Sequence, residues 1–226
     1  MRLFRRSTLC FYFLRISILS VVALVVAAFI LVRSPTTIIA PADPVAPVTV
    51  YITDYGYHRR LVLPTSQGEL IQYAYGDWDY FALNRQNWNN AIAALLIPTQ
   101  GTLGRREFKD LAQLRQTLGL DWQDILLSLE VSSSRVFSLE QSLDIRFNQN
   151  IDTSIFNPHN SLTLVKDERN YSLWHNSNHE LVSWLESLDC QVRGFVTLPN
   201  LQLQDTVSIL ELVMIRLRQY QAIIFN

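Results

Sequence analysis

The stretch LWHNSNHELVSWLESLDC, residues 173–190, gathers three kinds of reactive side chain. His175 and His179 are four residues apart, Ser177 lies between them, and Cys190 closes the stretch. Two neutral imidazoles at that spacing on a helix can bind zinc. A serine with a histidine base is a nucleophile, and a thiolate is a nucleophile of its own. The stretch therefore raises three hypotheses, namely a metal site, a serine nucleophile and a cysteine nucleophile.

The metal and cysteine hypotheses are the weaker two. The predicted helix covers about 178–189, so His175 precedes it, and only His159 remains as a third ligand. Cys190 follows the helix, at the electronegative end of its dipole, where a thiolate is disfavoured. We therefore predict no metal site, and we predict that Cys190 is a small core residue.

Ser177 has both a structural and a catalytic interpretation. Ser177 and Glu180 have the spacing of a capping box, in which each side chain accepts a hydrogen bond from the other residue's backbone N–H. Asn176 or Ser177 would cap the same helix. A hydroxyl that serves as a cap is a poor nucleophile, and a catalytic serine also needs a base.

Two upstream segments could supply that base and its orienting acid. His58 lies at the start of the apolar strand in YGYHRRLVLP, where its ring can face a cleft. Asp77 or Asp79, in YGDWDYF, could orient the histidine from a neighbouring strand. The alternatives are a surface or hydrogen-bonded histidine, and an acidic turn beside aromatic core residues.

Three segments carry a resemblance to a known family. VYITDYGYHRRLVLP, YAYGDWDYF and WHNSNHELVSWLESLDC, in this order, resemble the bacterial family called domain of unknown function 2459, over about residues 48–198. That family is similar in turn to circularly permuted, papain-like NlpC/P60 hydrolases. There, a histidine-bearing strand precedes a helix whose N-terminus carries a catalytic Asn-Cys pair. The resemblance implies that His58 is the base and that Asn176 is the asparagine, but it places a cysteine where this chain has Ser177.

The replacement of cysteine by serine matters physically. A helix N-terminus favours a thiolate, lowering a thiol pKa of about 8.5 toward neutrality. The pKa of a serine hydroxyl is too high for the same effect to ionise it. We therefore favour a degenerate binding site over an active one. The candidate catalytic residues are His58, Ser177 and Asp77, and the candidate binding residues are Asn176, Asp79, Trp78 and Tyr57.

The N-terminus has the composition of a membrane anchor. Residues 16–32 carry no charge, and four arginines precede them. This pattern predicts a transmembrane signal anchor within residues 11–33, with the N-terminus in the cytoplasm. The chain would then be a single-pass protein of the cytoplasmic or inner membrane, with its C-terminal domain outside the cytoplasm. A cleaved signal peptide is the alternative.

Charge and cysteine content limit the partners and the disulfide bonds that the predicted outer domain can have. Of the 19 basic residues 5 lie at or before Arg33, while all 20 acidic residues follow it, so residues 34–226 carry a net charge of −6. That charge argues against nucleic acid as a partner. Cys190 is the only cysteine of this part, so no intrachain disulfide can form within it.

The remaining pattern predicts an α+β domain. We expect a cytoplasmic N-terminus and anchor over 1–33, a proline-rich linker over 34–47 and an extracytoplasmic domain over 48–226. Strands and helices mix without a βαβ rhythm. The predicted strands cover 48–54, 57–64, 69–76, 125–131, 161–167 and 192–199, and the predicted helices cover 88–95, 108–118, 138–147, 178–189 and 207–217.

These expectations together describe a membrane-anchored envelope protein. Its domain, resembling a permuted papain-like fold, would bind a cell-wall or lipid-linked ligand, or an envelope protein partner, without turnover. One alternative is an amide or ester hydrolase or acyltransferase, with Ser177 as nucleophile and His58 as base. Another is a structural envelope component. No cofactor is indicated.

Overall fold

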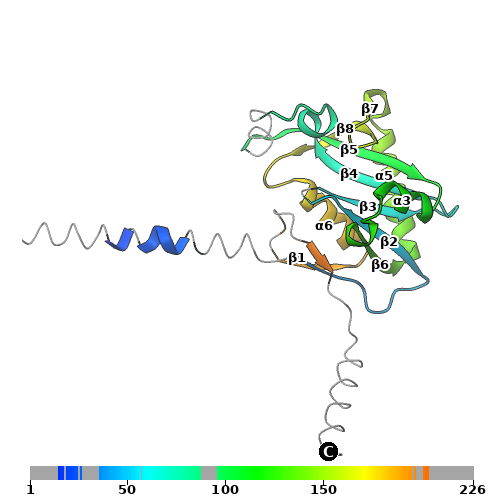
Figure 1. Ribbon diagram of the computed structural model, residues 1–226, viewed down its shortest axis with the longest axis horizontal. Coiled ribbons are helices and arrows are strands. Elements are labelled where there is room, and N and C mark those ends of the chain that lie inside the picture. Colours follow the sequence, from blue (N-terminus) through cyan, green and yellow to red (C-terminus); the bar gives the residue numbers. More distant parts are fainter. Residues whose placement is uncertain are drawn as a thin grey trace, which may run out of the picture.

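The computed structural model describes residues 15–17, 19–24, 26, 36–56, 58–87, 96–194, 196 and 201–203. Within them the fold is α+β and is built on one seven-stranded sheet (Figure 1). The strand order is β6-β2-β3-β4-β5-β8-β7, and every neighbouring pair is antiparallel. The strands are β2 Pro47–Asp54, β3 Arg59–Pro64, β4 Leu70–Asp77, β5 Thr99–Phe108, β6 Leu126–Ser132, β7 Ile155–Asn157 and β8 Leu162–Tyr171.

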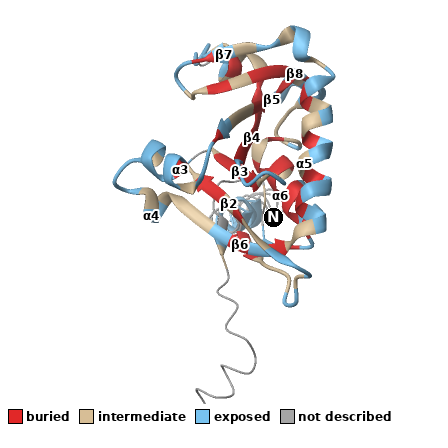
Figure 2. Cartoon of the chain, turned by 90° about the vertical axis from the view of Figure 1, so that its right-hand side faces the viewer, coloured by how far each residue is buried: buried red, intermediate tan, exposed pale blue. Residues whose placement is uncertain are grey.

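Helices cover both faces of this sheet. The longer pair, α5 (Ser133–Asn148) and α6 (Ser177–Ser187), lies along one face. The short α3 (Leu111–Leu118) and α4 (Trp122–Ile125) lie on the other side of the sheet, as Figure 2 shows. The π-helix η1 (Trp78–Ala82) follows β4, and a 3₁₀ turn, η2 (Ile151–Thr153), precedes β7.

Side-chain alternation along the strands separates two faces. In β4, Tyr73 and Tyr75 join the core under α5 and α6, whereas Ala74 belongs to a smaller cluster with Leu162 and Leu164 of β8. Successive side chains of a strand point to opposite faces, so this smaller cluster marks the face away from α5 and α6. We call these the helix face and the opposite face.

A second, three-stranded sheet joins the two ends of the described chain. β1 (Thr36–Ile39) pairs antiparallel with β9 (Gln191–Arg193) and parallel with β10 (Leu201–Leu203). Ile38 is fully buried and packs in the core of the helix face. The segment predicted as an extended linker, 34–47, therefore contains a strand that docks on the domain.

The predicted membrane anchor is not supported. In the described part of the chain, no helix is long and apolar enough to cross a bilayer. A spanning helix needs about 20 consecutive residues, whereas the described helical residues near the N-terminus are 15–17, 19–24 and 26. This finding contradicts the transmembrane helix, the signal anchor and the single-pass inner-membrane location expected from residues 11–33.

Two other expectations differ from the structure or fall outside it. The helix predicted to begin at Ser138 begins at Ser133 instead, directly after β6. Phe108, expected on a helix, ends strand β5. The predicted helices over 88–95 and 207–217 lie outside the described residues.

Candidate functional site

One end of the sheet collects several of the polar side chains singled out by the sequence. Asp77 is the last residue of β4, Thr99 is the first of β5, and Tyr171 is the last of β8. The register sets Thr99 opposite Tyr171. Asp77 is buried, and its two carboxylate oxygens accept hydrogen bonds from the Thr99 hydroxyl and from the backbone N–H of Tyr80, the latter at 2.7 Å. Asp77 therefore caps η1 and ties it to β5, and none of the hydrogen bonds found among the described residues joins it to a histidine.

Ser177, the first residue of α6, faces this end of the sheet. Its hydroxyl and backbone N–H lie close enough to the phenol of Tyr171 to lower the pKa of that residue. Burial raises the pKa of Tyr171, and the nearby Asp77 and Tyr80 add to the rise, while Ser177 opposes it. The phenol beside Ser177 is therefore neutral at physiological pH.

The cap of α6 lies one residue earlier than the predicted Ser177–Glu180 box. Asn176 has an extended backbone, and its side-chain oxygen accepts from the N–H groups of Asn178 and His179 at 3.0 and 3.3 Å. The His179 ring nitrogen Nδ1 accepts in return from the Asn176 N–H at 3.5 Å. Asn176 is thus the capping residue, and the Ser177 hydroxyl is not used as a cap.

Glu180 has a different role from the one its spacing predicted. Its side chain is fully buried and meets three cationic or imidazole groups: Arg146 of α5, Arg169 of β8 at 2.9 Å and His175 at 3.0 Å. Arg146 also pairs with the buried Asp167 at 2.7 Å. These ion pairs fasten α5 and α6 to β8 immediately behind Ser177.

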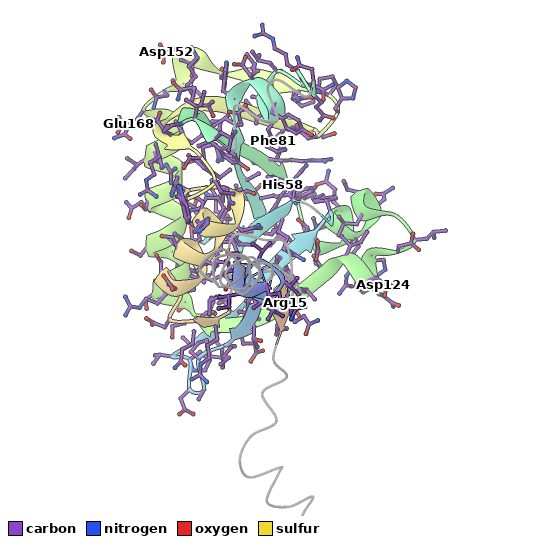
Figure 3. All side chains as sticks on the ribbon, turned by 90° about the vertical axis from the view of Figure 1, so that its left-hand side faces the viewer. Arg15, His58, Phe81, Asp124, Asp152 and Glu168 are labelled. Carbon is purple, nitrogen blue, oxygen red and sulfur yellow. The ribbon has the colours of Figure 1, made fainter. Side chains whose placement is uncertain are left out.

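His58 precedes β3 and packs against η1. Its ring packs on Phe81 with the ring centroids 4.3 Å apart, and the two are neighbours in Figure 3. Phe81 packs against the cluster of the opposite face, with Ala74. Burial, and then the positive charge of Arg60, lower the pKa of His58 to about 3, so the imidazole is neutral. The described residues therefore show His58 against Phe81, and no hydrogen bond found among them joins it to Ser177.

The remaining candidates are scattered. Asp79 and Trp78 lie in η1, where Asp79 pairs with Arg85 at 2.8 Å and Trp78 lies beneath the Lys166 ammonium at 5.5 Å. Tyr57 lies outside the described residues. Cys190 is buried, as predicted, and burial with the adjacent Asp189 raises its thiol pKa to about 11.

The chain has four histidines, and all four are described. His175 lies against Glu180, His179 against Asn176, and His58 against Phe81, while His159 is exposed in the turn before β8. None of the hydrogen bonds found in the described ranges joins a histidine to Ser177. Nor do three or more His, Cys, Asp or Glu side chains there lie where they could share a metal ion.

Sequence reasoning did not single out Tyr171, Thr99 or Arg146. The first two become neighbours only through the pairing of β5 with β8, and Arg146 reaches Glu180 only because α5 crosses beside α6. No local spacing connects these residues. A tyrosine at the end of a predicted strand, or an arginine on a predicted helix, does not by itself indicate a functional site.

Comparison with known proteins gave no further assignment. No family model, no curated protein and no solved structure matches the chain. The resemblance to the domain of unknown function 2459 family therefore stays a prediction from the three quoted segments.

Proposed function

We propose that this domain binds a ligand without turning it over, at the end of the sheet where α6 begins. The proposal is supported chiefly by the surroundings of the Ser177 hydroxyl, which contain Tyr171 where a serine hydrolase has a histidine base. A serine nucleophile needs a base to take its proton and a third group to orient that base. The hydroxyl of Ser177 instead lies beside the phenol of Tyr171, and no histidine among the described residues is hydrogen-bonded to it.

The groups that could replace histidine are also unsuitable. The phenol of Tyr171 has a raised pKa, so at neutral pH it carries its proton and cannot accept another. Asp77 uses both carboxylate oxygens on Thr99 and on the backbone of Tyr80. His175 is held against Glu180.

The surroundings of Ser177 fit a ligand that is polar but has an apolar face. Trp174 lies in the short turn between β8 and α6, which is closed by two backbone hydrogen bonds between Ser172 and His175, and it is 80% exposed. Tyr80 is 37% exposed, and its phenol is close enough to Tyr171 to affect the pKa of that residue. Exposed aromatic rings beside hydroxyl groups can stack on a ligand and hydrogen-bond to it at the same time. A saccharide or a short peptide, as found in a cell-wall fragment, has this chemistry.

Calorimetric titration with a soluble disaccharide-peptide wall fragment tests the proposal. The expected result is saturable binding, with the mass of the fragment unchanged after prolonged incubation. Trp174→Ala should weaken binding by about tenfold or more, as expected for an exposed aromatic anchor. Trp122→Ala, in α4 on the opposite face, is the matched control and should bind like the wild type.

Three results would overturn this proposal. Cleavage of the fragment would show that the domain is an enzyme. Absence of saturable binding would show that the domain does not bind a saccharide or short peptide of this kind. Equal weakening by Trp174→Ala and Trp122→Ala would show that the effect is not local to the end of the sheet.

A further inference from the structure

A cavity of about 220 Å³ lies at the end of β4 and β5 that is opposite Asp77. Its walls come from the turn after β3, the start of β4, the end of β5 and α5. The lining residues are Thr65, Ser66, Gln67, Glu69, Ile71, Arg105, Glu107 and Glu140. The strand register sets Glu107 opposite Ile71, and Ile71 belongs to the core under α5 and α6. The cavity therefore lies on the helix face of the sheet.

Carboxylates outnumber cations around this cavity. Arg105 pairs with Glu107 at 2.9 Å and with Asp144 of α5 at 3.4 Å. No ion pair found in the described part of the chain involves Glu69 or Glu140. We call these five residues the acidic cluster. Its four carboxylates and one guanidinium carry a charge of −3 when all are ionised, so negative charge is in excess.

The titration of Glu140 reflects this excess of negative charge. Burial raises the pKa of Glu140, the charge of Asp144 raises it further, and Arg105 acts in the opposite direction. Carboxylates that share a site disfavour each other's ionised form, whereas a nearby positive charge favours it. A cation that entered the cavity would therefore relieve the repulsion between Glu140 and Asp144.

A buried hydroxyl without a partner faces the same cluster. Tyr73 of β4 is fully buried and lies opposite Arg105 in the register. Burial raises the pKa of its phenol, Arg105 opposes the rise, and Glu140 and Asp144 add to it, so all three lie near the phenol. The Tyr73 hydroxyl and Oδ1 of Asp144 are buried and lack a hydrogen-bond partner among the described residues. Buried polar atoms are nearly always hydrogen-bonded, so these two oxygens indicate that a donor group belongs in the cluster.

We propose that this cavity binds the ammonium or guanidinium group at the end of an alkyl chain, as in a lysine or arginine side chain. Glu69, Glu107 and Glu140 accept hydrogen bonds from the cation, and its alkyl stem lies on Ile71.

Two observations favour this class of ligand over others. A cavity of about 220 Å³ holds a group of side-chain size, since pockets for whole drug-sized ligands are about 300–1,000 Å³. The described carboxylates do not lie where three of them could share a metal ion, so an organic cation fits better than a metal. The site lies at the opposite end of the strands from Ser177, and it does not depend on the function proposed there.

NMR titration of the full chain in about 0.15 M salt tests the site, because this salt screens weak long-range attraction. The probes are Nα-acetyl-lysine amide, pentylamine and Nα-acetyl-norleucine amide, whose side chain lacks the ammonium group. We expect at least one of the two cations to bind saturably, and at least about tenfold more tightly than the norleucine amide. Tighter binding of the lysine amide would assign the site to a side chain of a peptide or protein, and tighter binding of pentylamine would assign it to a free amine.

Variants of equal charge change locate the binding. Glu69→Gln should weaken cation binding by about tenfold, whereas Glu130→Gln, in the edge strand β6, should leave it within about twofold. Both glutamates are exposed, so both variants should fold like the wild type. A second readout is the side-chain carboxyl signal of Glu140, whose titration should move to lower pH in the presence of the cation. The signal of Glu186, in α6, should titrate as before.

The proposal is overturned by any of three results. The first is that neither cation saturates the protein up to about 20 mM, which would place any affinity below that of a specific site. The second is that the norleucine amide binds as tightly as the cations. The third is that Glu69→Gln and Glu130→Gln weaken binding equally, which would reduce the effect to net charge.

Discussion

Replacing Glu180 with glutamine tests the ion-pair cluster that holds α6 in place. The carboxylate is fully buried, and Asp167 beside it has a side-chain exposure of 1%, so both depend on the arginines for compensation. Arg146, at 17% exposure, would lose one of the two carboxylate partners found for it among the described residues, and His175 would lose its contact with the Glu180 carboxylate. Arg169 is 53% exposed, so its contribution is screened by water and is small. Removing one partner of a buried pair typically costs 3–5 kcal/mol, and we expect about 3 kcal/mol here.

Denaturant unfolding measures this loss, with a second glutamate of the same helix as the control. Glu186 is exposed near the end of α6, so Glu186→Gln should change the free energy of unfolding by less than about 0.5 kcal/mol. For a chain of this size, 3 kcal/mol corresponds to a fall in Tm of about 6–12 °C. If Glu180→Gln unfolds with a free energy within about 1 kcal/mol of the wild type, the cluster does not stabilise α6 as argued.

Further predictions concern titration and reactivity. The pKa of His58 is lowered to about 3, against about 6.5 when unfolded, so its contribution to stability is present above pH 6.5 and is lost as the pH falls toward 3. About 2 kcal/mol of the free energy of unfolding should be lost at pH 5. In denaturant titrations at several pH values, His58→Gln should reduce the dependence of this free energy on pH, whereas His159→Gln should not. An unchanged pH dependence in His58→Gln would contradict the burial of His58. Ser177→Cys should show a thiol pKa below about 8.5 in the pH dependence of iodoacetamide alkylation, because the helix N-terminus favours the thiolate; a value above that would show that the macrodipole does not reach position 177. The Cys190 thiol, with a pKa raised to about 11, should resist alkylation in the folded protein at pH 8, and rapid modification there would refute its place in the core.

Much of the sheet followed from its apolar strands. The segments 48–54, 57–64 and 69–76 are rich in β-branched and aromatic residues, and they form β2, β3 and β4 within a few residues of the predicted limits. The sequence TQGTLGRREF of β5 has two glycines and three charged residues, so it carries no strand signal although β5 lies inside the sheet, between β4 and β8. Gly101 is nevertheless required there, because a Cβ would overlap the Tyr75 hydroxyl and the Arg169 carbonyl.

The membrane prediction failed for a different reason. Hydropathy and flanking charge are the only properties that indicate a membrane span over residues 16–32, and neither property measures the length of a helix. The described helical residues there form no helix of spanning length.

The candidate site was predicted only in part. The start of α6 was located to within one residue from its capping pattern, because capping is a local property of the chain. The partners of Ser177 and Glu180 could not be predicted, because Tyr171 and Arg146 reach them through sheet register and helix packing. His58 shows the same limit. It was predicted to lie in a strand over 57–64, but β3 begins at Arg59, and the packing of the His58 ring on Phe81 of η1 follows from no local spacing.

Labelling with a fluorophosphonate probe tests the central claim most directly, because the probe reacts only with a serine that a base has activated. The purified chain and its Ser177→Ala variant are incubated with the probe, and adducts are located by peptide mass spectrometry. We predict no adduct on Ser177, because its hydroxyl lies beside the phenol of Tyr171 and no hydrogen bond among the described residues joins it to a histidine. A stoichiometric adduct on Ser177 that disappears in the Ser177→Ala variant would contradict this account and establish a serine hydrolase.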